Sequence, residues 1–273
     1  MRQRSRTEAS EDRWQALLGE AEQLLHRYLG ATDGLAHENK GIRRSELFFF
    51  YALVATSQPR RIVESGRARA QSTLVLARLF PEIQIVSLES DRNSPDAAIA
   101  AERLRECGNV DCRFGDSLLL LPQLVLPGDV VLIDGPKDFR ALKLAFRLLG
   151  SDQPSAVFVH DLWLGSQPRR FVERCLPRAL FSDEPAWVER YAILDSGRNA
   201  PPAASGTRRA YGATMGCFLA GDDDYYRRLQ QSRAAQGRDR LRATARKIFH
   251  RSPPRRPADF EIIPTGPLPN RPD

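Results

Sequence analysis

Cysteine is scarce in this chain, with four residues among 273, and none of them falls in a CxxC or Cys/His spacing. This scarcity argues against a zinc-ribbon or disulfide-stapled protein, because a chain of this length can bury an adequate core without either. We therefore expect a reducing compartment. The four cysteines are Cys107, Cys112, Cys175 and Cys217.

Long apolar runs are also missing. The longest, residues 47–55, is far too short to cross a bilayer. The basic N-terminus is not followed by the apolar segment of a secretory signal. The sequence therefore indicates a soluble, cytoplasmic protein.

Acidic residues are nearly absent from one stretch near the C-terminus. Residues 227–256 contain eleven Lys or Arg and a single acid, Asp239, whereas the formal net charge of the whole chain is +7. The positive excess is therefore a property of this basic tail and not of the rest of the chain. Such a tail suits a nucleic acid or an anionic membrane surface as a partner.

Beyond residue 57 the sequence alternates between short apolar runs and segments with helical spacing. This alternation indicates a parallel sheet with helices on both faces, so the expected fold class is α/β, Rossmann-like and doubly wound. The strands are predicted at 61–64, 83–89, 110–114, 129–133 and 156–160, and the helices between them at 71–80, 95–107, 117–124 and 138–149.

The flanking segments complete the expected organisation. Two N-terminal helices are predicted at 10–30, with Ser10 as the cap, and at 45–56. Later come a helix at 168–180, strands at 187–194 and 211–220, and between these strands a loop at 195–210 rich in Pro, Gly and Ser. The predicted divisions are an N-terminal helical segment (1–57), an α/β domain (58–221), and a basic helix with a Pro-rich tail lacking fixed structure (222–273).

The first predicted strand ends in a turn of small residues that opens a helix. In RIVESGRARAQS, residues 61–72, Glu64 closes the apolar run and Gly66, Ala68 and Ala70 follow at every second position. Small residues let the backbone approach a ligand closely, and the next helix offers free N–H groups at its N-terminus. The pattern is typical of a nucleotide site, with an ordinary strand-to-helix turn as the alternative.

Polar residues follow every predicted strand, at the edge where parallel sheets bind ligands. Glu89, after the second strand, can accept hydrogen bonds from both ribose hydroxyls of an adenosine-containing ligand. NAD fits this edge less well, because the turn lacks the second and third glycines of GxGxxG.

Two carboxylates, Asp134 and Asp161, stand at the tips of neighbouring predicted strands. Like charges repel, so such a pair shares a proton or holds a divalent cation. His160 would add an imidazole, although alternation along the strand favours its pointing to the opposite face. Lys137 could lose its proton beside a cation and act as a general base, or it could be a solvated surface lysine.

These segments together resemble the class I S-adenosylmethionine-dependent methyltransferases, and among them the metal-assisted O-methyltransferases of the catechol type with their bacterial sugar and antibiotic relatives. The resemblance spans 61–221, with five motifs in the family's order: ESGRARAQS, SLES, GDSLLLLPQL, IDGPKD and VHD. It implies a seven-stranded sheet with an antiparallel edge hairpin, S-adenosylmethionine as cofactor, and Mg²⁺ or Mn²⁺ as metal. It also implies a hydroxylated small molecule, such as a sugar, phenol or natural product, as methyl acceptor.

The resemblance also implies roles for individual residues. Lys137 would be the base, supported by Asp134, and His160 could replace Lys137 as the base of a metal-independent enzyme. The metal ligands would be Asp134, His160 and Asp161. The cofactor-binding residues would be Glu64, Gly66, Ala68, Ser72, Glu89, Asp116, Ser117 and Asp134.

Departures from the family pattern keep two other functions open. Ala68 and Ala70 stand where the family has glycine, which suits a cofactor-binding or partner-binding protein without catalysis. His160 stands where the catechol-type enzymes carry an acid, so the family pattern settles neither which metal binds nor whether a metal is needed. The basic tail, 227–256, would suit a nucleic-acid methyltransferase.

Overall fold

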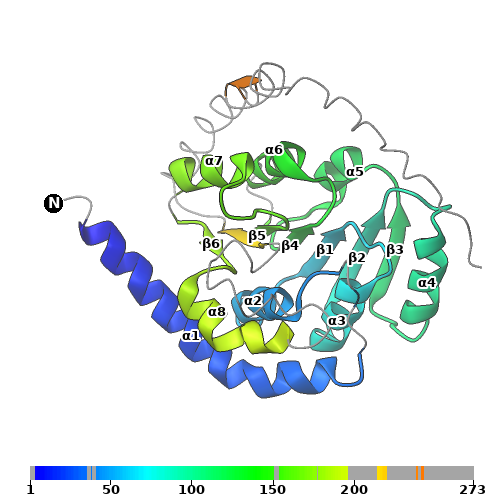
Figure 1. Ribbon diagram of the computed structural model, residues 1–273. Helices are drawn as coiled ribbons and strands as arrows, with labels where there is room; N and C mark the ends of the chain where they lie inside the picture. The colour runs from blue at the N-terminus through cyan, green and yellow to red at the C-terminus, as the bar shows by residue number, and fades with distance from the viewer. Residues whose placement is uncertain are drawn as a thin grey trace, which may run out of the picture.

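A seven-stranded sheet lies at the centre of the computed structural model (Figure 1). Its strand order is β3-β2-β1-β4-β5-β7-β6, so the chain winds outward from β1 first to one side and then to the other. The structure describes residues 4–35, 38, 41–150, 154–176, 178–195 and 214–219, together with 238, 241 and 242.

Six strands of the sheet run in one direction, and β7, next to the edge strand β6, runs antiparallel to them. Strand β7 pairs antiparallel with both β5 and β6, whereas β1 to β5 pair in parallel. The predicted doubly wound α/β fold with an antiparallel edge is confirmed. The strands are β1 (Arg61–Ser65), β2 (Gln84–Glu89), β3 (Val110–Phe114), β4 (Val130–Ile133), β5 (Ala156–Val159), β6 (Leu180–Phe181) and β7 (Gly216–Leu219).

Helices cover both faces of the sheet, because successive strand residues point to opposite sides. Ile62 of β1, for example, packs into one apolar cluster and Val63 into the other. On one face lie α1 (Arg4–Thr32), α2 (Arg44–Val54), α3 (Gln71–Leu79) and α8 (Pro185–Tyr191); on the other lie α5 (Ser117–Leu124), α6 (Asp138–Leu149) and α7 (Gln167–Cys175) (Figure 1). Helix α4 (Pro95–Leu104) packs beside the start of α3 through a small third cluster.

Helix α2 is almost wholly buried under the sheet. Phe48, Phe49 and Phe50 have no exposed surface, and the ring of Phe50 lies 4.4 Å from that of Phe158 in β5, centroid to centroid. This apolar segment is thus part of the core. The same helix carries one carboxylate, Glu46, into this apolar layer.

The strand predicted at 187–194 is wrong. Those residues form most of α8 and a short 3₁₀ helix, η1 (Ala192–Asp195). Pro185 occupies the first turn of α8, where proline is tolerated, and Trp187 and Tyr191 are buried one helical turn apart. Their aromatic character suggests a strand, but their spacing of four is helical.

The sixth strand instead comes from Leu180–Phe181, which the sequence places at the end of a helix spanning 168–180. Helix α7 ends at Cys175 because Leu176 leaves the helical conformation, and Leu176 precedes a proline. The first helix also begins earlier than predicted, at Arg4, so Ser10 lies inside it and does not cap it.

Several predictions fall partly or wholly on residues outside the described set. The loop at 195–210 is described only at Asp195, and the strand at 211–220 only from residue 214 to 219. The tail beyond 222 is described only at residues 238, 241 and 242, which are helical. None of the described helices is long and apolar enough to cross a bilayer.

Candidate active site

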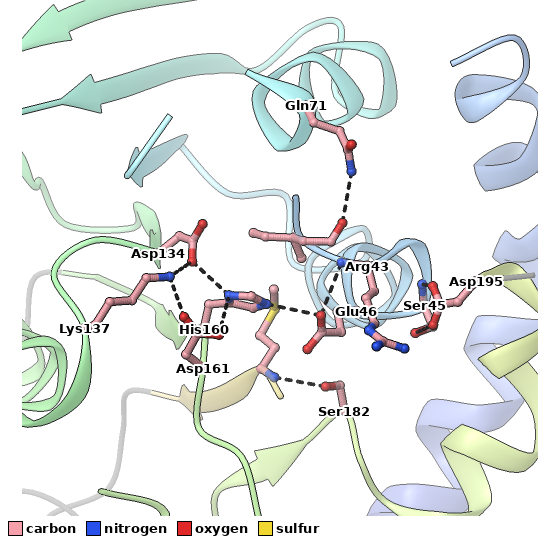
Figure 2. A network of polar contacts seen from close by, with 12 residues as sticks. Arg43, Ser45, Glu46, Gln71, Asp134, Lys137, His160, Asp161, Ser182 and Asp195 are labelled. Carbon is pink, nitrogen blue, oxygen red and sulfur yellow. Dashed lines mark hydrogen bonds and ion pairs between the residues drawn. The ribbon is translucent and has the colours of Figure 1, made fainter. Parts of the chain in front are cut away.

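The polar residues that follow β4 and β5 meet in one cluster (Figure 2). Asp134 Oδ1 lies 2.8 Å from His160 Nδ1 and 2.5 Å from Lys137 Nζ. The same Nζ lies 2.5 Å from Asp161 Oδ2, so the ammonium bridges two carboxylates. The prediction that the Asp134 and Asp161 carboxylates meet at one edge of the sheet is confirmed, and Lys137 and His160 join them there.

His160 points into this cluster and not to the opposite face, so the alternation argument is wrong here. Strand β5 ends at Val159, and Asp161 takes a positive φ of 63°. The period of two therefore stops before residue 160, and both side chains turn toward Asp134. One ligand atom each from Asp134, His160 and Asp161 lies within 4.8 Å of the others.

Glu46 also belongs to this network, although none of the sequence motifs indicates it. Its carboxylate is fully buried, and Oε2 lies 3.1 Å from His160 Nε2 and accepts a hydrogen bond from the Arg43 backbone N–H. It reaches the site from α2, 114 positions away from His160 in the chain. Its one sequence signal is a carboxylate at the start of an otherwise apolar helix.

The ionisable groups in this network shift one another's pKa values. Burial opposes ionisation of Asp134, but His160 and Lys137 outweigh it and lower the Asp134 pKa to about 2. Burial likewise opposes the charge on His160, but Glu46 and Asp134 outweigh it and raise the His160 pKa to about 10. Burial raises the pKa of Glu46, and the neighbouring His160 partly offsets this.

Lys137 does not have the lowered pKa that a general base needs. Burial acts in that direction, but Asp134 and Asp161 outweigh it and raise the Lys137 pKa above its usual value. As long as both carboxylates face it, the amine keeps its proton. This raised pKa belongs to the cluster without a cation, so the lowering expected for Lys137 beside a cation stays a prediction.

The turn between β1 and α3 lies directly against this cluster. Gly66 has a φ of 95°, and a Cβ there would lie 2.7 Å from the Gly135 nitrogen and 2.9 Å from the Asp134 carbonyl carbon. Ala68 and Ala70 also adopt positive φ angles, 43° and 61°. The two alanines therefore keep the backbone conformation that glycine adopts without strain.

Glu64 supports this turn from within the protein. Its carboxylate is fully buried and accepts hydrogen bonds from the hydroxyls of Ser72, Thr73 and Ser87, the first at 2.5 Å and the last at 2.8 Å. These bonds join β1 to α3 and β2. The structure thus places Glu64 and Ser72 beneath the turn, where they hold its shape.

The residues predicted to face adenosine follow β2 and β3. Glu89 accepts from the backbone N–H groups of Ala68, at 2.8 Å, and Ser90, at 2.7 Å, so it connects β2 to the turn. Asp116 caps α5 by accepting from the Leu118 N–H at 2.9 Å. Ser117 Oγ lies 2.9 Å from Ser65 Oγ. All lie at the carboxyl edge of the sheet, where the sequence places them.

The cluster after β4 and β5 has a donor set that suits a divalent cation. Two carboxylates and one imidazole lie within 4.8 Å of one another. The carboxylates suit Mg²⁺ or Mn²⁺, and the imidazole shifts the preference toward Mn²⁺, Fe²⁺ or Zn²⁺. The position between the carboxylates already attracts a cation, because the Lys137 ammonium lies there. A metal would compete with Lys137 for the same two side chains.

No family model and no curated protein matches this sequence. Solved structures do match. The O-methyltransferase TomG from Streptomyces achromogenes, involved in tomaymycin synthesis and solved with SAM, is 22% identical over 72% of this chain and 89% of its own, with a TM-score of 0.47. An O-methyltransferase from Bacillus cereus, solved with SAH, is 20% identical over 74% and 90%, with a TM-score of 0.42. With TM-scores below 0.5 these likenesses do not decide the chemistry, which rests on this chain's own residues.

Proposed function

We propose that this chain is an S-adenosylmethionine-dependent methyltransferase that methylates an oxygen of a hydroxylated small molecule with the help of a divalent cation. The observation that carries the proposal is the backbone contact between Gly66 and the Asp134–Gly135 peptide. Through this contact, a methyl donor held by the turn would lie beside the cluster of Asp134, Lys137, His160 and Asp161.

The cofactor half of the proposal rests on the carboxyl edge of β1, β2 and β3. The turn at Gly66 admits a ligand close to the backbone, and the first turn of α3 offers N–H groups to the methionine carboxylate. Glu89 is the acceptor for the ribose hydroxyls, and Asp116 and Ser117 border the adenine. Glu64 and Ser72 hold the turn that makes these contacts.

The catalytic half follows from the position of Lys137 between two carboxylates. A divalent cation at Asp134, His160 and Asp161 would lower the pKa of an acceptor hydroxyl as a Lewis acid. Carboxylates engaged in this way would stabilise the protonated amine less, which would remove the cause of the raised Lys137 pKa and let Lys137 act as a base. Lys137 would take the hydroxyl proton, and the acceptor oxygen would attack the sulfonium methyl as the carbon–sulfur bond breaks, leaving S-adenosylhomocysteine.

The test measures S-adenosylhomocysteine release over a panel of phenols, sugars and hydroxylated natural products, with Mg²⁺ or Mn²⁺. Lys137→Ala and Asp134→Asn should each reduce turnover at least ~100-fold, because proton transfer and cation binding are lost. Their affinity for S-adenosylhomocysteine should change less than about threefold.

The matched control is Lys143→Ala, which removes an exposed lysine from α6, the helix that begins directly after Lys137. It should retain the activity of the parent chain. Full activity in Lys137→Ala would refute the role of the lysine, and full activity in EDTA would refute the role of the cation.

A further inference from the structure

We infer that Glu46 is a positioning residue that fixes the imidazole of His160, so that Nε2–H is held by Glu46 and Nδ1 is presented to Asp134 and Asp161. The role in catalysis rests on the proposed function, whereas the orientation of the ring does not. Figure 2 shows the arrangement, with the imidazole between Glu46 on one side and Asp134 on the other.

The geometry of the ring carries the inference. His160 Nε2 lies 3.1 Å from Glu46 Oε2, and Nδ1 lies 2.8 Å from Asp134 Oδ1 and 3.5 Å from Asp161 Oδ1. Rotating the ring by 180° about its Cβ–Cγ bond would put carbon atoms in both positions. The bond to Glu46 therefore selects which edge of the imidazole faces the cluster.

Burial by itself does not favour a carboxylate at this position. Glu46 and His160 are both buried, and Glu46 Oε1 has no hydrogen-bond partner in the described part of the chain. Desolvating such a carboxylate is costly, and an apolar side chain of similar size would suit the surrounding helix better. What Glu46 provides is a hydrogen-bond acceptor at a defined place behind His160.

The same arrangement is what a metal-ligating histidine requires. Such a histidine donates its second ring N–H to a carboxylate or carbonyl, which fixes the tautomer and the direction of the ligating lone pair. Glu46 supplies that carboxylate from α2, so Nδ1 is the nitrogen directed at the donor set of Asp134 and Asp161. A carbonyl acceptor at residue 46 could keep part of this effect, whereas an apolar side chain could not.

The test is nuclear magnetic resonance of the full chain labelled with ¹⁵N-histidine, with His160→Asn used to assign the ring among the chain's four histidines. The parent chain should show a proton on Nε2 of His160 that exchanges slowly with water. Glu46→Leu should lose this slow exchange, and Glu46→Gln, which keeps an acceptor, should retain part of it. An unprotonated Nε2 in the parent chain, or unchanged exchange in Glu46→Leu, would overturn the inference.

The matched control is Asp195→Asn. Asp195, the last residue of η1, is a second buried carboxylate that contacts the start of α2, where it accepts from the N–H and hydroxyl of Ser45 at 3.0 and 2.6 Å. The control perturbs the same helix end and leaves the pair of Glu46 and His160 in place. Asp195→Asn should leave the His160 ring signals unchanged. If these signals change as much as in Glu46→Leu, the effect of Glu46→Leu reflects a general loosening of this helix end and not the loss of one hydrogen bond.

A second measurement separates this inference from the proposed function. Calorimetric titration with Mn²⁺ should show affinity at least about 10-fold weaker in Glu46→Leu than in the parent chain, with Glu46→Gln in between. Binding of S-adenosylhomocysteine should change less than about twofold. If the parent chain binds both ligands and Glu46→Leu binds Mn²⁺ equally well, the inference fails and the function stands. If the parent chain binds neither ligand, the function fails, and the ring measurement still decides the role of Glu46.

Discussion

The imidazole of His160 lies between two carboxylates, and its charge depends on both. Asp134 and Glu46 together outweigh the cost of burying a positive ring. In turn the ring and Lys137 keep Asp134 ionised. At the level of single residues, the site is therefore a set of charges that stabilise one another. Removing any one of them leaves a buried charged partner uncompensated.

The stability of the protein should follow these shifts with pH. His160 has a raised pKa, so its contribution is complete below about pH 6.5 and is lost as the pH rises toward about 10. Asp134 has a lowered pKa, so its contribution is complete above about pH 3.8 and is lost as the pH falls toward about 2. Denaturant unfolding from pH 2 to pH 10 should show both declines. In His160→Asn the alkaline decline should shrink, and an unchanged alkaline slope would contradict the pairing.

At the scale of elements, most of the sheet could be predicted from the sequence. Each parallel strand lies within one residue of its predicted ends, because buried apolar runs and short turns define them locally. The failures are at the antiparallel edge. There a two-residue strand is too short to produce a periodic pattern, and the aromatic residues of α8 resemble a strand in composition but not in spacing.

The contact between the turn at Gly66 and the loop at Gly135 can be tested by substitution. Gly66→Ala should lower the free energy of unfolding by about 2 kcal/mol or more, because the added methyl group meets the backbone at Gly135 and φ is positive. It should also weaken binding of S-adenosylhomocysteine, since the turn must move away from Asp134. Calorimetry and denaturant unfolding measure the two effects.

Ala68→Gly is the matched control for that change. It relieves a positive φ of 43° at an exposed alanine without touching the Gly66 contact. The variant should be at least as stable as the parent chain. Equal stability of Gly66→Ala and the parent chain would show that the two loops are not in contact.

At the scale of the whole molecule, the site joins segments that are far apart in the chain. Asp134, Lys137 and Asp161 could be predicted together because they follow neighbouring parallel strands. The direction of the His160 side chain could not, because strand alternation favours the opposite face. Glu46 could not, since its place beside His160 depends on how α2 packs across the sheet. The positive φ angles of Ala68 and Ala70 could not be predicted either, because the folded protein imposes them. From composition alone, the alanine methyl groups suggest a turn too narrow for a ligand.

The basic tail, residues 227–256, gives a prediction that concerns the whole chain. We propose that it binds polyanions, either nucleic acid or an anionic membrane surface, through its eleven Lys and Arg residues. A chain ending after Ala220 should lose salt-sensitive binding to RNA and to phosphatidylserine vesicles, and should keep its affinity for S-adenosylhomocysteine. Binding to either polyanion that survives truncation would place the basic surface elsewhere.

We propose that the turn at Gly66 holds S-adenosylmethionine against the cluster at Asp134. The most direct test of this proposal is calorimetric titration of the full chain with S-adenosylhomocysteine in Mg²⁺, in Mn²⁺ and in EDTA. We expect binding of about micromolar affinity, because Ala68 and Ala70 keep the backbone course of a glycine turn. The absence of binding in all three conditions would contradict the account and favour a protein that uses this fold to bind a partner.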